Sequence, residues 1–299
     1  MQKTTGLLAS SLIKLKNLQL TAKLVSEELM LGIHSSKRSG IGIEFEQYRH
    51  YEPGDDPKRI DWKLFARTDK HLVRESSTES DRQVRFVLDL SGSMNYAEHS
   101  VSRLQYAQIL LASLAYLCYI QNDQMSLYGL TGGRVETISG TGSASSARQA
   151  FQKILVGLEK ATAAGPWITA AAGSRQLEFQ SKKREQLIFV SDLLQVGDEW
   201  LSWIRSLAGP NREIVVFQIL GDQEREFDLK GFYRFKDLES GREMELDAEA
   251  VGTQFRTSMQ AYLAGVKAAL QIPHVRLVQA RMSEPVGMVL KAFLTRRKG

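Results

Sequence analysis

Two aspartates of this sequence follow short apolar runs and could hold a metal ion together. Asp89 ends the run Phe-Val-Leu, and Asp192 ends the run Leu-Ile-Phe-Val-Ser. If both runs are parallel strands of one α/β sheet, their carboxyl ends meet at the edge where such sheets bind ligands. Two buried carboxylates repel each other, and a divalent cation between them removes that repulsion.

The residues after Asp89 add hydroxyl groups at regular spacing. Ser91 and Ser93 follow it in an Asp-x-Ser-x-Ser pattern, and Gly92 permits a tight turn that points all three side chains at one place. Carboxylate and hydroxyl oxygens are the hard ligands that Mg²⁺, Mn²⁺ and Ca²⁺ prefer. No His or Cys lies close enough in the sequence to indicate zinc. With few charged ligands, a small octahedral ion that keeps several waters fits best, and we predict Mg²⁺, with Mn²⁺ or Ca²⁺ as alternatives.

Strand-like and helix-like segments alternate around these residues. The expected strands are 83–89, 125–130, 135–138, 186–190, 213–220 and 275–279, with a turn at Gly132-Gly133. The expected helices are 102–120, 145–158, one from about 169, 199–207, 250–270 and 285–294. This alternation predicts an α/β fold with a doubly wound, mostly parallel sheet. Two strand-like segments flank Ser240-Gly241, which predicts a β-hairpin insert at 228–247.

The N-terminal part has a different pattern. Residues 12–31 carry apolar side chains at helical spacing, which predicts one amphipathic helix that packs on its own protein rather than on a membrane. Residues 32–42 are rich in Gly, Ser and cations and are expected to form a loop. We therefore expect two parts: an N-terminal helix and extended segment at 1–82, packed on a main domain at 83–299.

Composition narrows the class of protein. The 299 residues are 43% hydrophobic and 24% charged, which is ordinary for a globular chain. The net charge of +5 is scattered, without the basic patch interleaved with aromatics that nucleic-acid binding needs, so a basic nucleic-acid-binding protein is only an alternative. The single Cys118 suits a reducing compartment. No signal peptide is evident, and the apolar stretch 104–122 contains too many polar residues for a good membrane span, so we expect a cytoplasmic protein.

An enzymatic role has little support in the sequence. The Asp89 loop lacks the second aspartate of Asp-x-Asp phosphatases, and no base accompanies Ser91 or Ser93. The Gly-x-Ser-x-Gly and phosphate-binding-loop motifs are also missing from the sequence. A binding protein without catalysis is therefore the favoured hypothesis, and a magnesium-dependent hydrolase or phosphatase is the alternative.

The sequence also resembles known protein families. Asp89-Leu-Ser-Gly-Ser-Met94 resembles the metal-ion-dependent adhesion site of von Willebrand factor A domains. Residues 32–40, 44–45, 49–56, 59–62 and 66–68, with 235–241 and 290–297 downstream, are similar to a bacterial family known as domain of unknown function 58. The similarity covers nearly the whole chain, and the stretch from Pro-Gly-Asp-Asp to Asp-Trp is its most specific part.

This resemblance implies further ligands and a mechanism. In A domains a threonine from a second loop and an aspartate from a third also touch the metal. Asp192 matches the third loop; for the second we predict Thr169, at a plausible helix N-cap, with Thr162 as the alternative. The resemblance implies that the ion keeps an open position which an acidic side chain of a partner protein completes. It also implies a partner, namely a MoxR-type AAA+ ATPase or a client that it remodels.

The segment 55–62, with Asp55, Asp56, Arg59 and Trp62, has two interpretations. It could form a second cation site or a contact surface. It could instead be structural, with a preceding Pro-Gly turn, an arginine paired to a carboxylate and a tryptophan anchored in the core. We favour the structural interpretation.

Overall fold

The computed structural model describes residues 7–35, 48–51, 72–74, 82–131, 134–140, 146–166, 177, 184–194 and 197–295. Three sequence-based predictions lie outside these ranges. They are the placement of Thr169 with its helix, the turn at Gly132-Gly133 and the role of the segment 55–62.

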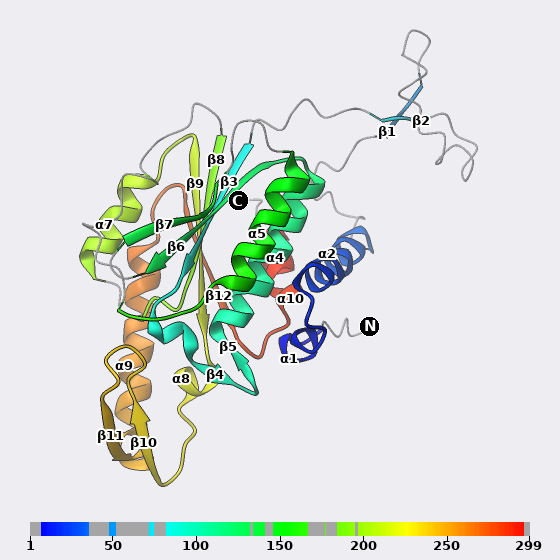
Figure 1. Ribbon diagram of the computed structural model, residues 1–299. Coiled ribbons are helices and arrows are strands. Elements are labelled where there is room, and N and C mark those ends of the chain that lie inside the picture. The colour runs from blue at the N-terminus through cyan, green and yellow to red at the C-terminus, as the bar shows by residue number, and fades with distance from the viewer. Residues whose placement is uncertain are drawn as a thin grey trace.

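A six-stranded sheet forms the centre of the protein (Figure 1). Its strands are β3 (Arg82–Asp89), β6 (Gln124–Thr131), β7 (Arg134–Ser139), β8 (Arg184–Ser191), β9 (Arg212–Leu220) and β12 (Val275–Arg281). Their order is β12-β9-β8-β3-β6-β7, and every pair is parallel except the one between β6 and the edge strand β7. The chain enters the sheet in the middle at β3 and continues through β6 to the edge strand β7. It then crosses back to β8, on the other side of β3. This order confirms the predicted doubly wound, mostly parallel sheet.

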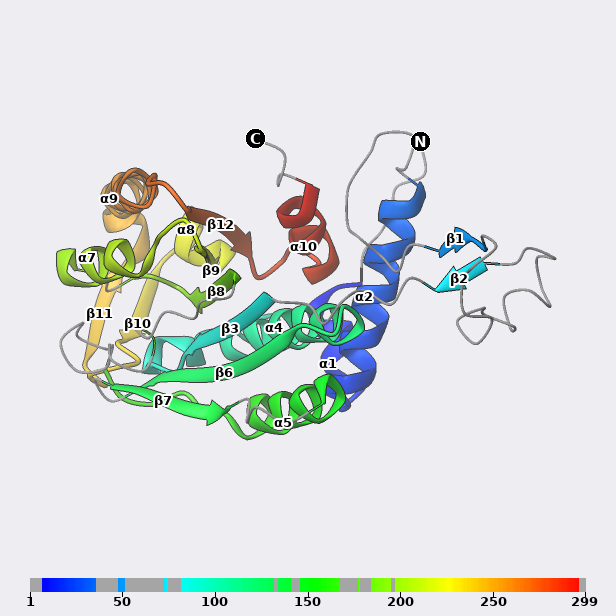
Figure 2. The ribbon, with the colours of Figure 1, turned by 90° about the horizontal axis from the view of Figure 1, so that it is seen from above.

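Helices cover both faces of the sheet (Figure 2), and each face has its own hydrophobic cluster. One face carries α4 (Arg103–Ile120), α5 (Ala147–Lys160) and α10 (Val286–Thr295), and the other carries α7 (Asp198–Leu207) and α9 (Ala248–Ala269). The helix α4 starts at a capping box, in which Ser102 accepts from the Gln105 N–H and the Gln105 side chain accepts from the Ser102 N–H. The strands β3 and β8 each have a neighbouring strand on both sides, and helices cover both faces of the sheet. Both strands are therefore almost continuously buried.

The N-terminal segment forms two helices, so the prediction of one helix at 12–31 was wrong. They are α1 (Ala9–Ile13) and α2 (Leu18–Ser35), and the chain bends between them at Lys16, whose φ is 48°. The Asn17 side chain accepts from the Leu20 N–H at 2.8 Å, which caps and starts a new helix. The loop expected from residue 32 is also corrected, because α2 continues to Ser35. The apolar side of α2 is buried, and the helix packs on α4 and α10.

Several small elements complete the fold. An antiparallel hairpin joins β10 (Phe232–Lys236) to β11 (Glu243–Asp247). Elements not predicted from the sequence are β1 (Tyr48–His50), β2 (Leu72–Arg74), β4 (Ala97–Glu98), β5 (Val101–Ser102) and the short helix α8 (Asp222–Glu226). The tight turn expected at Gly92 is a 3-10 turn at Gly92–Asn95. The hairpin, α8 and the β4–β5 pair lie at the end of the sheet where β9 ends (Figure 1). Among the helices described, none has the length and hydropathy to cross a membrane.

Candidate metal centre at the carboxyl edge of the sheet

The structure brings the two predicted aspartates to the same edge of the sheet. Asp89 is the last residue of β3 and Asp192 follows β8, which is the parallel neighbour of β3. Both side chains are buried. Burial first, and then the negative charge of Asp192, raise the pKa of Asp89 to about 7, against the hydrogen bonds from Ser91 and Ser191 that lower it. The two carboxylates therefore repel each other when both are ionised.

The hydroxyls of the aspartate loop, which we define as residues 89–94, lie close to Asp89. Its Oδ1 accepts from the Ser91 N–H at 2.8 Å, and its Oδ2 accepts from the Ser191 hydroxyl at 2.7 Å. The Oγ atoms of Ser91 and Ser93 are 3.0 Å apart. Carboxylate and hydroxyl oxygens from Asp89, Ser91 and Ser93 thus gather at the end of β3.

The loop that follows α5, residues 161–166, lies against the aspartate loop. The Ala164 N–H donates to the Leu90 carbonyl, and the Gly92 N–H donates to the Gly165 carbonyl, both at 2.8 Å. Thr162, the alternative ligand, lies in this loop and is exposed. Thr169 follows the loop, outside the described residues, and its role as a ligand stays a prediction.

A buried arginine beside these predicted ligands was missed by the sequence analysis. Arg103, the first residue of α4, is fully buried. Its guanidinium donates to Asp192 and, at 2.9 Å, to the Ser93 carbonyl, and its second nitrogen donates to the Glu224 carboxylate. Burial acts to lower the pKa of Arg103, but Asp192 and Glu224 outweigh burial and raise it. One signal could have revealed this residue, because Arg103 is the only charged residue of an apolar 18-residue helix, and a buried arginine needs carboxylate partners.

Two glutamates hold the start of α8, and one of them, Glu224, is a partner of Arg103. Glu224 also accepts from the Gly221 N–H at 2.8 Å, in the first turn of α8. Glu98 accepts from the Asp222 and Gln223 N–H groups at 2.9 Å and from the Tyr96 hydroxyl at 2.5 Å. These carboxylates satisfy backbone donors at the start of the helix, and so they hold α8 over the end of the sheet.

The residues present suit a hard divalent cation. The Arg103 guanidinium pairs with Asp192 and Glu224, and Asp89 adds a third carboxylate close to Asp192, so among these four described groups the negative charges exceed the single positive charge when all are ionised. A divalent ion would supply positive charge, and hydroxyl oxygens with water would complete an oxygen shell. Within the described ranges no group of three or more His, Cys, Asp or Glu residues is arranged to hold a metal. A bound ion would therefore depend on the serine hydroxyls, and it would share Asp192 with Arg103.

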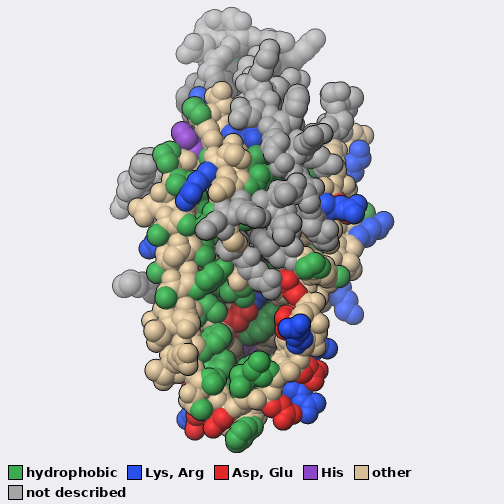
Figure 3. Space-filling view, turned by 90° about the vertical axis from the view of Figure 1, so that its left-hand side faces the viewer, with side chains coloured by type: hydrophobic (Ala, Val, Ile, Leu, Met, Phe, Trp, Pro, Cys, Tyr) green, Lys and Arg blue, Asp and Glu red, His purple; other side chains and the backbone are tan. Residues whose placement is uncertain are grey.

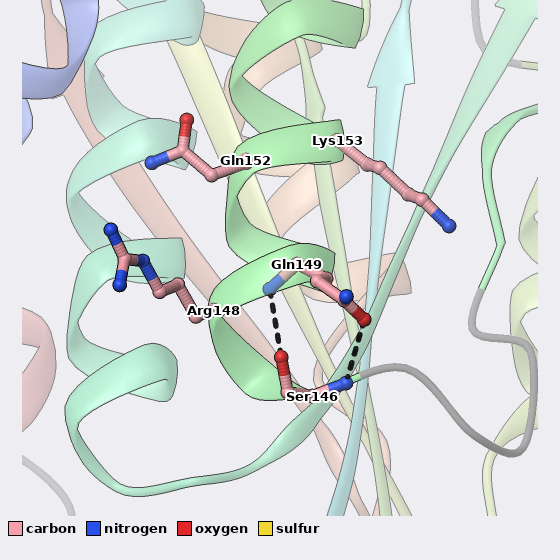
Figure 4. A pocket seen from close by; sticks show the side chains of 5 residues that line it. All are labelled: Ser146, Arg148, Gln149, Gln152 and Lys153. Atoms are coloured by element: carbon pink, nitrogen blue, oxygen red, sulfur yellow. Dashed lines mark hydrogen bonds between the residues drawn. The ribbon is translucent and has the colours of Figure 1, made fainter.

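A depression at the start of α5 has no comparable arrangement. Figure 4 shows its side chains, those of Ser146, Arg148, Gln149, Gln152 and Lys153. Ser146 and Gln149 bond to each other as a capping box, and the long side chains of Arg148 and Lys153 point to opposite sides. Two of these groups cap the helix, and the five side chains do not point toward a common position where a ligand could bind.

Similar proteins are known both by sequence and by structure. An uncharacterized protein of Mycobacterium tuberculosis is 23% identical over 290 residues, which cover 95% of this chain and 89% of that protein. Among solved structures, the conserved hypothetical protein BatB from Bacteroides thetaiotaomicron has a TM-score of 0.46 at 14% identity, covering 72% of this chain and 97% of that chain. A von Willebrand factor type A structure from Catenulispora acidiphila has a TM-score of 0.38 at 15% identity, covering 50% and 34%.

The family resemblance stated from the sequence is confirmed by a family model that matches residues 47–265, which is most of the chain. The chain belongs to the family described as protein of unknown function DUF58.

Proposed function

We propose that this chain is a non-enzymatic, metal-dependent protein-binding module. Its ion is Mg²⁺, with Mn²⁺ or Ca²⁺ as alternatives, held by Asp89, Ser91, Ser93, Asp192 and Thr169. An acidic side chain of a partner protein completes the shell. The observation that supports this proposal most is the pair of buried aspartates, with two serine hydroxyls, at one edge of the sheet, where the Arg103 guanidinium pairs with Asp192 and Glu224.

The chain's own residues prepare the site. The hydrogen bonds from the Ser91 N–H and the Ser191 hydroxyl fix the orientation of the Asp89 carboxylate. The Leu194 N–H, at 3.1 Å, and Arg103 do the same for Asp192. When bound, the ion attracts a carboxylate, and the fixed ligands set the direction from which the carboxylate approaches.

The partner that we propose is a MoxR-type AAA+ ATPase or its client, on the strength of the family resemblance. The site has apolar surface nearby, because the β10–β11 hairpin exposes Phe232 (83%) and Met244 (60%). Figure 3 shows hydrophobic side chains gathered on the lower half of this face, with acidic side chains along its lower edge. Aromatic residues and methionine are the types enriched in protein interfaces.

Calorimetric titration with Mg²⁺ tests the metal site. Wild type is expected to bind one ion, and Asp89→Ala to bind none while keeping its circular dichroism spectrum. Asp228→Ala removes an exposed carboxylate from the loop after α8 and serves as the matched control, with wild-type affinity expected. Equal titration curves for wild type and Asp89→Ala would refute the metal site.

Capture of a purified MoxR-type ATPase from the same organism tests the partner. Immobilised wild-type chain is expected to retain the ATPase in Mg²⁺ and to release it in chelator, and Asp89→Ala is expected to retain none. Retention that is equal in chelator and in Mg²⁺ would show that any contact with the ATPase does not use the metal.

A further inference from the structure

The turn that follows Asp192 has a strained backbone. Leu193 has a φ of 55°, in the left-handed region, which is disfavoured for a leucine because its Cβ approaches the following carbonyl oxygen. Its side chain is completely buried, in the hydrophobic cluster on the α7 and α9 face of the sheet. Strained residues of this kind persist only where the surrounding contacts hold them, and they concentrate at functional sites. The contacts of Leu193 therefore bear on the orientation of the aspartate that precedes it.

Hydrogen bonds to the neighbouring strands hold this turn. The Leu193 N–H donates to the Ser191 hydroxyl oxygen at 2.9 Å, and that hydroxyl donates in turn to Asp89 at 2.7 Å. The Asp192 carbonyl accepts from the Gln218 side chain of β9 at 3.0 Å. The backbone on either side of the Asp192 carboxylate is thus tied to the strands next to it.

A further contact comes from the helix α9. The Tyr262 hydroxyl donates to the Leu193 carbonyl at 2.6 Å, from a residue 69 positions further along the chain. Tyr262, Val266 and Leu270 lie at helical spacing and pack into the same hydrophobic cluster as Leu193. The helix begins directly after β11, and so it continues the chain of the hairpin (Figure 1). A helix on the face of the sheet is thereby bonded to the residue next to Asp192.

We propose that Tyr262 is a positioning residue of the metal site, and that α9 regulates the metal affinity through this hydroxyl. This inference rests on the proposed function. Loss of the hydroxyl takes this donor from the Leu193 carbonyl, so the turn can relax out of its left-handed conformation, and the orientation of Asp192 then changes. Because coupling between two sites is reciprocal, occupation of the metal site also stabilises the turn and its contact with α9.

The variant Tyr262→Phe tests this proposal, with Tyr106→Phe as the matched control. Tyr106 is a buried tyrosine of α4, and its hydroxyl donates at 2.8 Å to the carbonyl of Glu284, which follows β12. Each change therefore deletes one hydroxyl that bonds to a backbone carbonyl.

Calorimetric titration measures the metal affinity of both variants. The Mg²⁺ affinity of Tyr262→Phe is expected to fall roughly tenfold, the scale for loss of a group that orients a ligand, and that of Tyr106→Phe is expected to match wild type. The Ca²⁺ affinity of Tyr262→Phe is expected to fall by a smaller factor, because Ca²⁺ tolerates irregular ligand geometry and Mg²⁺ does not.

Hydrogen exchange measures the turn and the helix directly. In chelator, the Leu193 and Leu194 amides are expected to exchange faster in Tyr262→Phe than in wild type. On addition of Mg²⁺, the amides of α9 around Tyr262 are expected to exchange more slowly in wild type and in Tyr106→Phe. The variant Tyr262→Phe is expected to show no such slowing.

The outcomes separate this inference from the proposed function. If wild type binds Mg²⁺ and Asp89→Ala does not, but Tyr262→Phe binds as tightly as wild type, the positioning role is refuted and the metal site stands. An equal loss of Mg²⁺ affinity in Tyr262→Phe and Tyr106→Phe would also refute that role, since the loss would then reflect lower stability in general. If wild type binds no Mg²⁺, the proposed function is refuted and this inference with it.

Discussion

Replacement of Arg103 by methionine tests the charge balance at the sheet edge. Methionine keeps most of the length of the side chain, so the change removes the charge with little loss of packing. The guanidinium is fully buried, and its loss leaves Asp192 and Glu224 without their cation. Breaking a buried ion pair from one side costs about 3–5 kcal/mol, and we expect the free energy of unfolding of Arg103→Met to fall by about that amount in chelator.

Mg²⁺ is expected to restore part of this loss. The dication would supply positive charge to the same carboxylates, so the variant should bind it more tightly than wild type does. Binding to the folded state alone contributes about 2.7 kcal/mol when the ion is at 100 times its Kd. Urea unfolding followed by circular dichroism, in chelator and at several Mg²⁺ concentrations, measures both quantities for the two proteins.

An exposed arginine provides the control. Arg281 pairs with Asp222 and Glu226, but its side chain is 37% exposed, so Arg281→Met should cost about 1 kcal/mol or less and show no special response to Mg²⁺. An Arg103→Met variant as stable as wild type in chelator would refute the role of Arg103 as counter-ion. Equal Mg²⁺ increments in Arg103→Met and wild type would refute the idea that the ion and the guanidinium serve the same carboxylates.

Three further predictions concern other parts of the molecule. Glu185→Gln leaves two buried arginines without their shared carboxylate, and urea unfolding should show a loss of about 3–5 kcal/mol. Gly92→Ala forces a Cβ against the Leu238 carbonyl, and it should cost about 1–3 kcal/mol and speed hydrogen exchange in 237–242; unchanged exchange would contradict the contact. Burial raises the pKa of Cys118 to about 12, so the folded protein should resist alkylation at pH 8, and its thiol-dependent stability, complete below about pH 9, should fall as pH rises towards 12.

The sequence by itself determined the class of fold and the placement of two aspartates at one edge of the sheet. Apolar runs alternating with helical segments specify a doubly wound sheet, because each run is buried on both faces and each helix must cover one. Asp89 and Asp192 could be placed at one edge for the same reason, since parallel strands end together. These properties depend on local patterns of a few residues, which a single sequence displays.

Only the tertiary structure decided which groups meet at that edge. Arg103 and Glu224 are 121 residues apart, and the turn that covers Gly92 comes from a hairpin that the chain forms only after β9 and α8. No periodicity links such residues, because their contact depends on where the chain returns after each crossover. The break between α1 and α2 has a different origin, because it follows from a local cap at Asn17 that competes with a continuous apolar stripe. Local patterns therefore fixed the strand ends, and the packing of distant segments fixed the charges and the backbone that surround them.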